Sequence, residues 1–139
     1  MDLTIIIPTY NRINSLGITL ESIKSKKYDI EILIIDNGSV DGTYKFLSEY
    51  ASSHANVKVF RINVNTGSPA GPYNIGLKQA TGEYCCFMYD DDSFNDGAID
   101  TFMDVIRQGQ LPMYYFNCSI NGSDKGSTIG LSNLDLVLF

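Results

Sequence analysis

Three consecutive carboxylates, Asp90, Asp91 and Asp92, directly follow the apolar run 84–89. Like charges this close repel, so a fold keeps them together only where water, a cation or hydrogen-bond donors offset the repulsion. Carboxylate oxygens are the ligands that Mg²⁺ and Mn²⁺ prefer. The cluster therefore predicts a divalent-cation site, with a solvated acidic turn as the alternative interpretation.

Polar residues that suit a nucleotide follow two earlier apolar runs. Asp36 follows the run 30–35, and its carboxylate can accept hydrogen bonds from a base edge or ribose hydroxyls, or it can close an Asp-Asn-Gly turn. Tyr10 follows the run 3–7 and can stack on a base or simply pack. Arg12 can hold a phosphate or pair with one of the acids.

The expected elements place these residues together. Strands are predicted at 3–7, 30–35, 57–63, 84–89 and 113–118. Helix patterns separate them, with predicted caps at Asn14 or Ser15, at Asp41 and at Asp96, and a short helix ending at Ala80. The alternation predicts an α/β fold, an open and mostly parallel, Rossmann-like sheet with helices on both faces. The carboxyl ends of such strands share one edge, where ligands bind.

Composition narrows the class of protein. The 139 residues suit one domain, and 44% hydrophobic and 19% charged residues are typical of a soluble globular protein. A net charge of −6 argues against a nucleic-acid partner. No apolar run has the roughly 20 residues of a transmembrane helix, so we expect a cytoplasmic protein. Cys85, Cys86 and Cys118 are predicted to be reduced and buried.

Four ordered motifs carry a resemblance to a known family. They are PTYNR at 8–12, IIDNGSVDGT at 34–43, NTGSPAGPYNIGLKQATGEY at 65–84 and FMYDDD at 87–92. Together they resemble the inverting family 2 glycosyltransferases of the GT-A fold, over about residues 3–106. The resemblance implies a nucleotide-sugar-binding GT-A domain at 1–120. Residues 121–139 stay unassigned, and one interpretation makes them the start of an acceptor-binding half.

The resemblance also implies an activity and its partners. The implied activity is transfer of a sugar from a nucleotide-diphosphate sugar to an acceptor hydroxyl, with inversion at the sugar. It belongs to bacterial-type surface polysaccharide synthesis, and the implied cofactor is Mg²⁺ or Mn²⁺. The implied acceptor is a saccharide or a lipid-linked molecule. An acceptor of this kind is compatible with peripheral membrane association of the protein. Two alternatives stay open: a non-catalytic nucleotide-sugar-binding module or fragment lacking the general base, and a flavodoxin-like phosphoacceptor domain that binds Mg²⁺ through the aspartates.

Individual site residues follow from matching the motifs position by position. The implied nucleotide-sugar contacts are Pro8, Thr9, Tyr10, Arg12, Asp36, Asn65, Gly67, Asn74 and Asp90. The implied metal ligands are Asp91, which is preferred, and Asp92. The motif departs from the family at Tyr89, which stands in place of the first acid, so the ligand assignment is open by one position.

Two further positions limit the match. Tyr73 precedes Asn74, where the family often has a basic residue. An inverting transfer also needs a general base, and no recognisable motif supplies one. Asp124 and Asp135 are interpreted as solvated loop acids. The catalytic residue therefore stays unknown.

Overall fold

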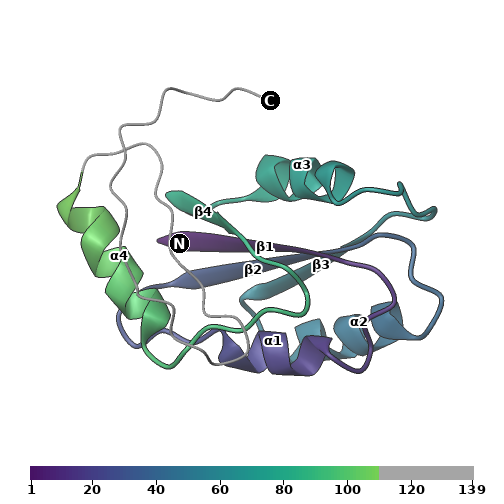
Figure 1. The fold of residues 1–139 in the computed structure, drawn as a ribbon, viewed down its shortest axis with the longest axis horizontal. Helices are drawn as coiled ribbons and strands as arrows, with labels where there is room; N and C mark the ends of the chain where they lie inside the picture. The colour runs from purple at the N-terminus through teal and green to yellow at the C-terminus, as the bar shows by residue number, and fades with distance from the viewer. Residues whose placement is uncertain (110–139) are drawn as a thin grey trace, which may run out of the picture. The chain divides into compact units, whose positions relative to one another are not determined.

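A computed structural model of the protein describes residues 1–109. Residues 1–100 form one compact unit, and residues 101–139 belong to a second. In the described part, four parallel strands form a sheet in the order β3-β2-β1-β4 (Figure 1). The strands are β1 (Leu3–Thr9), β2 (Ile30–Asp36), β3 (Val57–Arg61) and β4 (Tyr84–Phe87). The predicted α/β fold with a parallel sheet is confirmed.

Helices cover both faces of this sheet. They are α1 (Leu16–Ser22), α2 (Thr43–Ser53) and α3 (Ala70–Gln79), and α4 (Ala98–Gln108) follows β4. Figure 1 shows α3 on one face of the sheet and α1 with α2 on the other. Every residue of β1 and β2 is buried, as expected of strands that are covered on both faces.

The predicted strand ends differ from those in the structure. β1 and β2 extend past the predicted ends because they stay in parallel register as far as the pair Thr9 and Asp36. β4 stops at Phe87, two residues early, because its pairing with β1 ends at Ile6. β3 likewise ends at Arg61. The predicted strand 113–118 and the predicted domain boundary at 120 lie outside the described residues.

The core on the α3 face fixes the height of that helix above the sheet. Ile6, Leu33 and Ile35 are fully buried there, and Tyr73 packs against them. Gly76 faces the Ile6 side chain, and a Cβ atom at Gly76 would collide with it. A glycine therefore lets α3 lie close to β1, which brings Tyr73 toward the end of β4.

Helix starts follow the predicted residues closely. Ser15 is the N-cap of α1, although its side chain makes no capping hydrogen bond. The N-cap of α2 is Gly42, at φ 97°, instead of the predicted Asp41. The Asp41 carboxylate still acts on the first turn, because it accepts hydrogen bonds from the Thr43 backbone N–H at 3.0 Å and the Thr43 hydroxyl at 2.6 Å. α4 begins two residues after Asp96.

The prediction of buried cysteines is wrong for Cys85, which is exposed. The reason is that β4 pairs only with β1 among the described residues. Cys86 is partly buried, and burial raises the pKa of its thiol to about 11. Cys118 lies outside the described residues. Within residues 1–109, no helix has the length and apolar character to cross a membrane.

Candidate functional site

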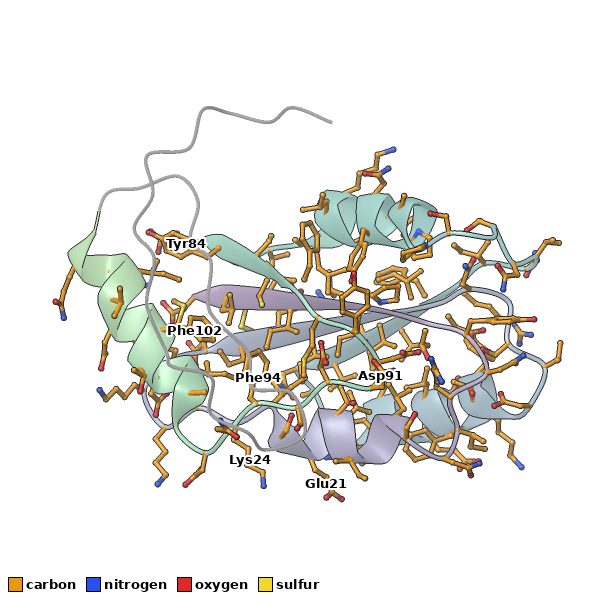
Figure 2. The ribbon with its side chains drawn as sticks, viewed as in Figure 1. Glu21, Lys24, Tyr84, Asp91, Phe94 and Phe102 are labelled. Carbon is orange, nitrogen blue, oxygen red and sulfur yellow. The ribbon has the colours of Figure 1, made fainter. Side chains whose placement is uncertain are left out.

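The ends of β1, β2 and β4 bring the predicted residues to one edge of the sheet. Thr9 is the register partner of Asp36, and its carbonyl accepts a hydrogen bond from the Asn37 N–H at 2.8 Å. One residue past the end of β4, the Met88 N–H donates to the Ile6 carbonyl at 3.1 Å and keeps this segment beside β1. Figure 2 labels Asp91 on the segment that follows β4, on the same side of the sheet as α1.

Asp90 is the most firmly held of the three acids. It is buried, and its Oδ2 atom accepts a hydrogen bond from the Thr9 hydroxyl at 2.8 Å. The Thr19 hydroxyl of α1 donates to the Asp90 carbonyl at 3.0 Å. The Arg12 Nε atom lies 3.4 Å from Asp90 Oδ1. Three segments therefore fix the position of this carboxylate.

Arg12 also reaches Asp91, with Nη2 at 3.6 Å from Asp91 Oδ2. The guanidinium thus partly neutralises two of the three acids. Its backbone is held by the first residue of α2, because the Arg12 N–H donates to Thr43 Oγ1 at 3.0 Å. Asn11 precedes it at φ 54° and donates its N–H to Ser39 Oγ at 2.9 Å. These contacts anchor the segment that carries Arg12.

Asp36 is fully buried and only partly satisfied. Its Oδ1 atom accepts the Ser39 N–H at 3.3 Å, which is the turn hydrogen bond expected from the Asp-Asn-Gly sequence. Its Oδ2 atom has no hydrogen-bond partner in the described part of the chain. The Arg61 Nε atom lies 3.6 Å from it. The turn therefore uses one oxygen and leaves the other as an available acceptor.

The segment 65–67 is locked to the end of β2 through Asn37. The Asn37 Oδ1 atom accepts the Thr66 N–H at 3.1 Å, and Asn37 Nδ2 donates to Asn65 Oδ1 at 3.3 Å. Asn65 Oδ1 also accepts the Gly67 N–H at 2.6 Å, with Gly67 at φ 72°. These contacts hold Asn65 and Gly67 beside the loop that follows Asp36.

Tyr73 occupies the position where the family often has a basic residue. Its hydroxyl donates to the Met88 carbonyl at 3.4 Å, and its ring meets Phe87 edge to face at 4.7 Å. Burial, together with the nearby Tyr89 and Asp90, raises the pKa of Tyr73 to about 12. Tyr73 therefore keeps its proton and brings no positive charge to the site.

The structure brings Thr9, Arg12, Asp90 and Asp91 into one connected set. The remaining predicted residues fall into two groups. Tyr10 is 43% exposed, next to Thr9, whereas Pro8 is buried in β1. The other remaining residues that are exposed are Asn65, Gly67, Asn74 and Asp92, of which Asn74 lies on α3, and Asp36 is buried.

Sequence reasoning missed four residues of this edge: Thr19, Asn37, Ser39 and Arg61. Asn37 and Ser39 lie inside the IIDNGSVDGT motif, so the signal was present there. Thr19 lies in a helix and Arg61 ends a strand, and neither position has a local motif. Their roles appear only when the strands are side by side.

The carboxylates at this edge of the sheet are the type of ligand that a hard cation prefers. Among residues 1–109, no three His, Cys, Asp or Glu side chains gather closely enough to hold a metal ion by themselves. Asp91 and Asp92 are exposed, so their oxygens are accessible from solvent. Mg²⁺ commonly takes one or two carboxylates and completes its shell with substrate phosphates and water. The donor set fits such an ion when a diphosphate is also bound.

Comparison with known proteins gives a consistent result. The family model "Glycosyl transferase family 2" matches residues 4–132. A poly(ribitol-phosphate) beta-glucosyltransferase of Bacillus spizizenii is 32% identical over 113 residues, which are 79% of this chain and 18% of that protein. The GalNAc(5)-diNAcBac-PP-undecaprenol beta-1,3-glucosyltransferase of Campylobacter jejuni is 33% identical over 85% of this chain and 38% of its own length.

Solved structures share the fold. Residues 1–349 of S. aureus TarS in complex with UDP-GlcNAc match with a TM-score of 0.71 and 30% identity, over 78% of this chain and 32% of that one. The mannosyltransferase PcManGT of Pyrobaculum calidifontis, in complex with GDP-Man and Mn²⁺, matches with a TM-score of 0.66 and 26% identity, over 79% and 32%. The chain therefore spans well under half the length of these relatives.

Proposed function

The chain belongs to glycosyl transferase family 2, and from that premise we propose that it is the donor-binding part of an inverting glycosyltransferase. The reaction is transfer of a sugar from a nucleotide-diphosphate sugar to an acceptor hydroxyl. The observation that carries the proposal is the connected set at the carboxyl edge of the sheet, where Thr9, Arg12 and Asp90 are joined by a hydrogen bond and an ion pair. In open α/β sheets this edge is where nucleotides bind.

Each residue of the edge has a proposed role toward the donor. Tyr10 is exposed enough for its ring to stack on the base, and the free Oδ2 of Asp36 accepts a hydrogen bond from a base or ribose. Pro8, Asn65, Gly67 and Asn74 complete the proposed nucleotide-sugar contacts.

The diphosphate end of the donor is assigned to the acids and Arg12. Asp91 and Asp92 are the proposed ligands of Mg²⁺ or Mn²⁺, with Asp91 preferred. When bound, such an ion supplies Lewis-acid stabilisation of the charge on the leaving diphosphate. Arg12 adds a second positive charge, and Asp90, held by Thr9, orients the ribose.

The acceptor and cellular role are proposed from the relatives. The Bacillus and Campylobacter relatives are named for a poly(ribitol-phosphate) and an undecaprenol-linked saccharide. We propose a saccharide or lipid-linked acceptor and a role in surface polysaccharide synthesis. A cytoplasmic location, with peripheral membrane association, suits that acceptor.

Calorimetric titration with UDP and GDP, each with and without Mn²⁺, tests the proposal. Metal-dependent binding of one of them is the expected result. Absence of any such binding would sink the proposed function. A second candidate is a module that binds the donor without transferring the sugar. A transfer assay distinguishes the two.

A further inference from the structure

Strand β2 carries two buried carboxylates, and each faces a cation on β3. Glu31 and Asp36 are 1% and 0% exposed. Lys58 pairs with Glu31, and Arg61 pairs with Asp36. The two pairs lie on the same two strands, so they can be compared directly.

The Glu31 pair is fully hydrogen-bonded. Lys58 Nζ donates to Glu31 Oε1 at 2.8 Å. Glu31 Oε2 accepts the Thr4 hydroxyl at 2.7 Å and the Thr81 N–H at 2.9 Å. Both oxygens are occupied, so this carboxylate has a structural role.

The Asp36 pair is arranged differently. Arg61 Nε stays 3.6 Å from Asp36 Oδ2, beyond hydrogen-bond distance. The guanidinium is held by other groups, because its Nη2 donates to the Ser39 carbonyl at 3.2 Å and its Cζ lies 4.5 Å from the centroid of the Tyr44 ring. Arg61 therefore supplies positive charge to Asp36 without occupying its acceptor.

A buried acceptor with no hydrogen bond destabilises a fold. This loss of stability is offset if a bound ligand donates a hydrogen bond to the free Asp36 oxygen. A pocket of about 380 Å³ has Arg61 in its lining, together with Tyr44 and Ser39. The side chain of Arg61 is 38% exposed whereas that of Asp36 is 0% exposed, so only the cation of the pair reaches the protein surface.

We propose that Arg61 is a positioning residue for the nucleotide: it places its positive charge beside Asp36 and leaves Oδ2 of that carboxylate free to accept a hydrogen bond from the donor's base or ribose. This inference rests on the proposed function, because it requires Asp36 to contact the nucleotide. It adds a residue that no motif identifies. It also predicts that the two cations of β3 differ in function.

Matched substitutions of the two cations test the inference. UDP is titrated calorimetrically, with Mn²⁺, into wild type, Arg61→Met, Arg61→Lys and Lys58→Met, and the folded fraction of each is measured by circular dichroism. Arg61→Met is expected to raise the Kd about tenfold or more. Lys58→Met is expected to lower stability but to leave the Kd of the folded protein within about twofold. Arg61→Lys is expected to give a Kd between those of wild type and Arg61→Met, because it keeps the charge but loses the guanidinium that stacks on Tyr44.

The outcomes separate this inference from the proposed function. If wild type binds neither UDP nor GDP, both are overturned. If wild type binds and Arg61→Met binds equally well, or if Lys58→Met loses affinity to the same extent, only the role of Arg61 is overturned. If Arg61→Met does not fold, Tyr44→Leu takes its place, since it removes the ring beneath the guanidinium and keeps both charges. A Kd raised by about threefold or more supports the proposal, and a wild-type Kd overturns it.

Discussion

At the residue scale, the three acids after β4 have different surroundings. Asp90 is buried and hydrogen-bonded to Thr9, whereas Asp91 is exposed and lies 3.6 Å from Arg12. A buried and bonded carboxylate orients a ligand, and an exposed one is accessible to a cation from solvent. This difference favours Asp91 as the metal ligand for a physical reason that is independent of its place in a motif.

We expect Asp91→Ala to abolish the Mn²⁺-dependent part of nucleoside diphosphate binding, because it removes the preferred ligand. The measurement is calorimetric titration of UDP or GDP with and without Mn²⁺. Asp29→Ala is the control, since Asp29 is exposed and lies just before β2, at the opposite end of that strand from Asp36. Wild-type binding by Asp91→Ala, with loss in Asp92→Ala, would move the assignment to Asp92.

Arg12 gives a second prediction at this scale. Its guanidinium lies within 3.6 Å of both Asp90 and Asp91, so a cation that approaches these acids meets a resident positive charge. Arg12→Gln is therefore expected to tighten binding of Mn²⁺ alone by roughly threefold or more. Lys24→Gln removes the same charge from an exposed residue just after α1 and should leave Mn²⁺ affinity unchanged. Equal changes in Mn²⁺ affinity for Arg12→Gln and Lys24→Gln would contradict this prediction, because they would mean that the affinity depends only on the net charge of the protein.

At the scale of elements, the sequence predicted the strands and helices well because each has its own local pattern. The polar residues at the ends of β1 and β2 were found for the same reason. Arg61 was missed because its partner Asp36 lies 25 positions away in the chain and only the β2–β3 register joins them. Thr19 was missed likewise, since its partner is the backbone carbonyl of Asp90. Local patterns predict elements, whereas contacts between elements require the fold.

Glu31 shows what such a contact does for stability. Burial alone would raise its pKa, but hydrogen bonds from Lys58, the Thr81 backbone and Thr4 together lower it from 4.5 to about 2. A carboxylate with a lowered folded-state pKa stabilises the fold above the unfolded value. That contribution is present above about pH 4.5 and is lost as the pH falls toward about 2.

Glu31→Gln is expected to lower the free energy of unfolding at pH 7 by about 1–3 kcal/mol, because the Lys58 charge loses its partner. The difference from wild type should shrink between pH 4.5 and pH 2 as wild-type Glu31 becomes protonated. Urea unfolding at several pH values measures it. A difference that stays constant across this range would contradict the assigned pKa.

At the scale of the whole molecule, the four aspartates Asp36, Asp90, Asp91 and Asp92 are all proposed to act on the donor side. Asp36 faces Arg61, and Asp90 and Asp91 face Arg12. Deprotonation of the acceptor by a general base typically contributes about 10²–10⁴-fold to the rate, so a carboxylate outside this set must act as that base.

We expect the 139-residue chain to bind a UDP-sugar with Mn²⁺ but to transfer sugar to a ribitol-phosphate or lipid-linked saccharide no faster than it hydrolyses the donor. Release of UDP with and without acceptor measures both rates. Acceptor-stimulated transfer that is lost in Asp124→Asn or Asp135→Asn, with UDP binding unchanged, would contradict this expectation and identify the base.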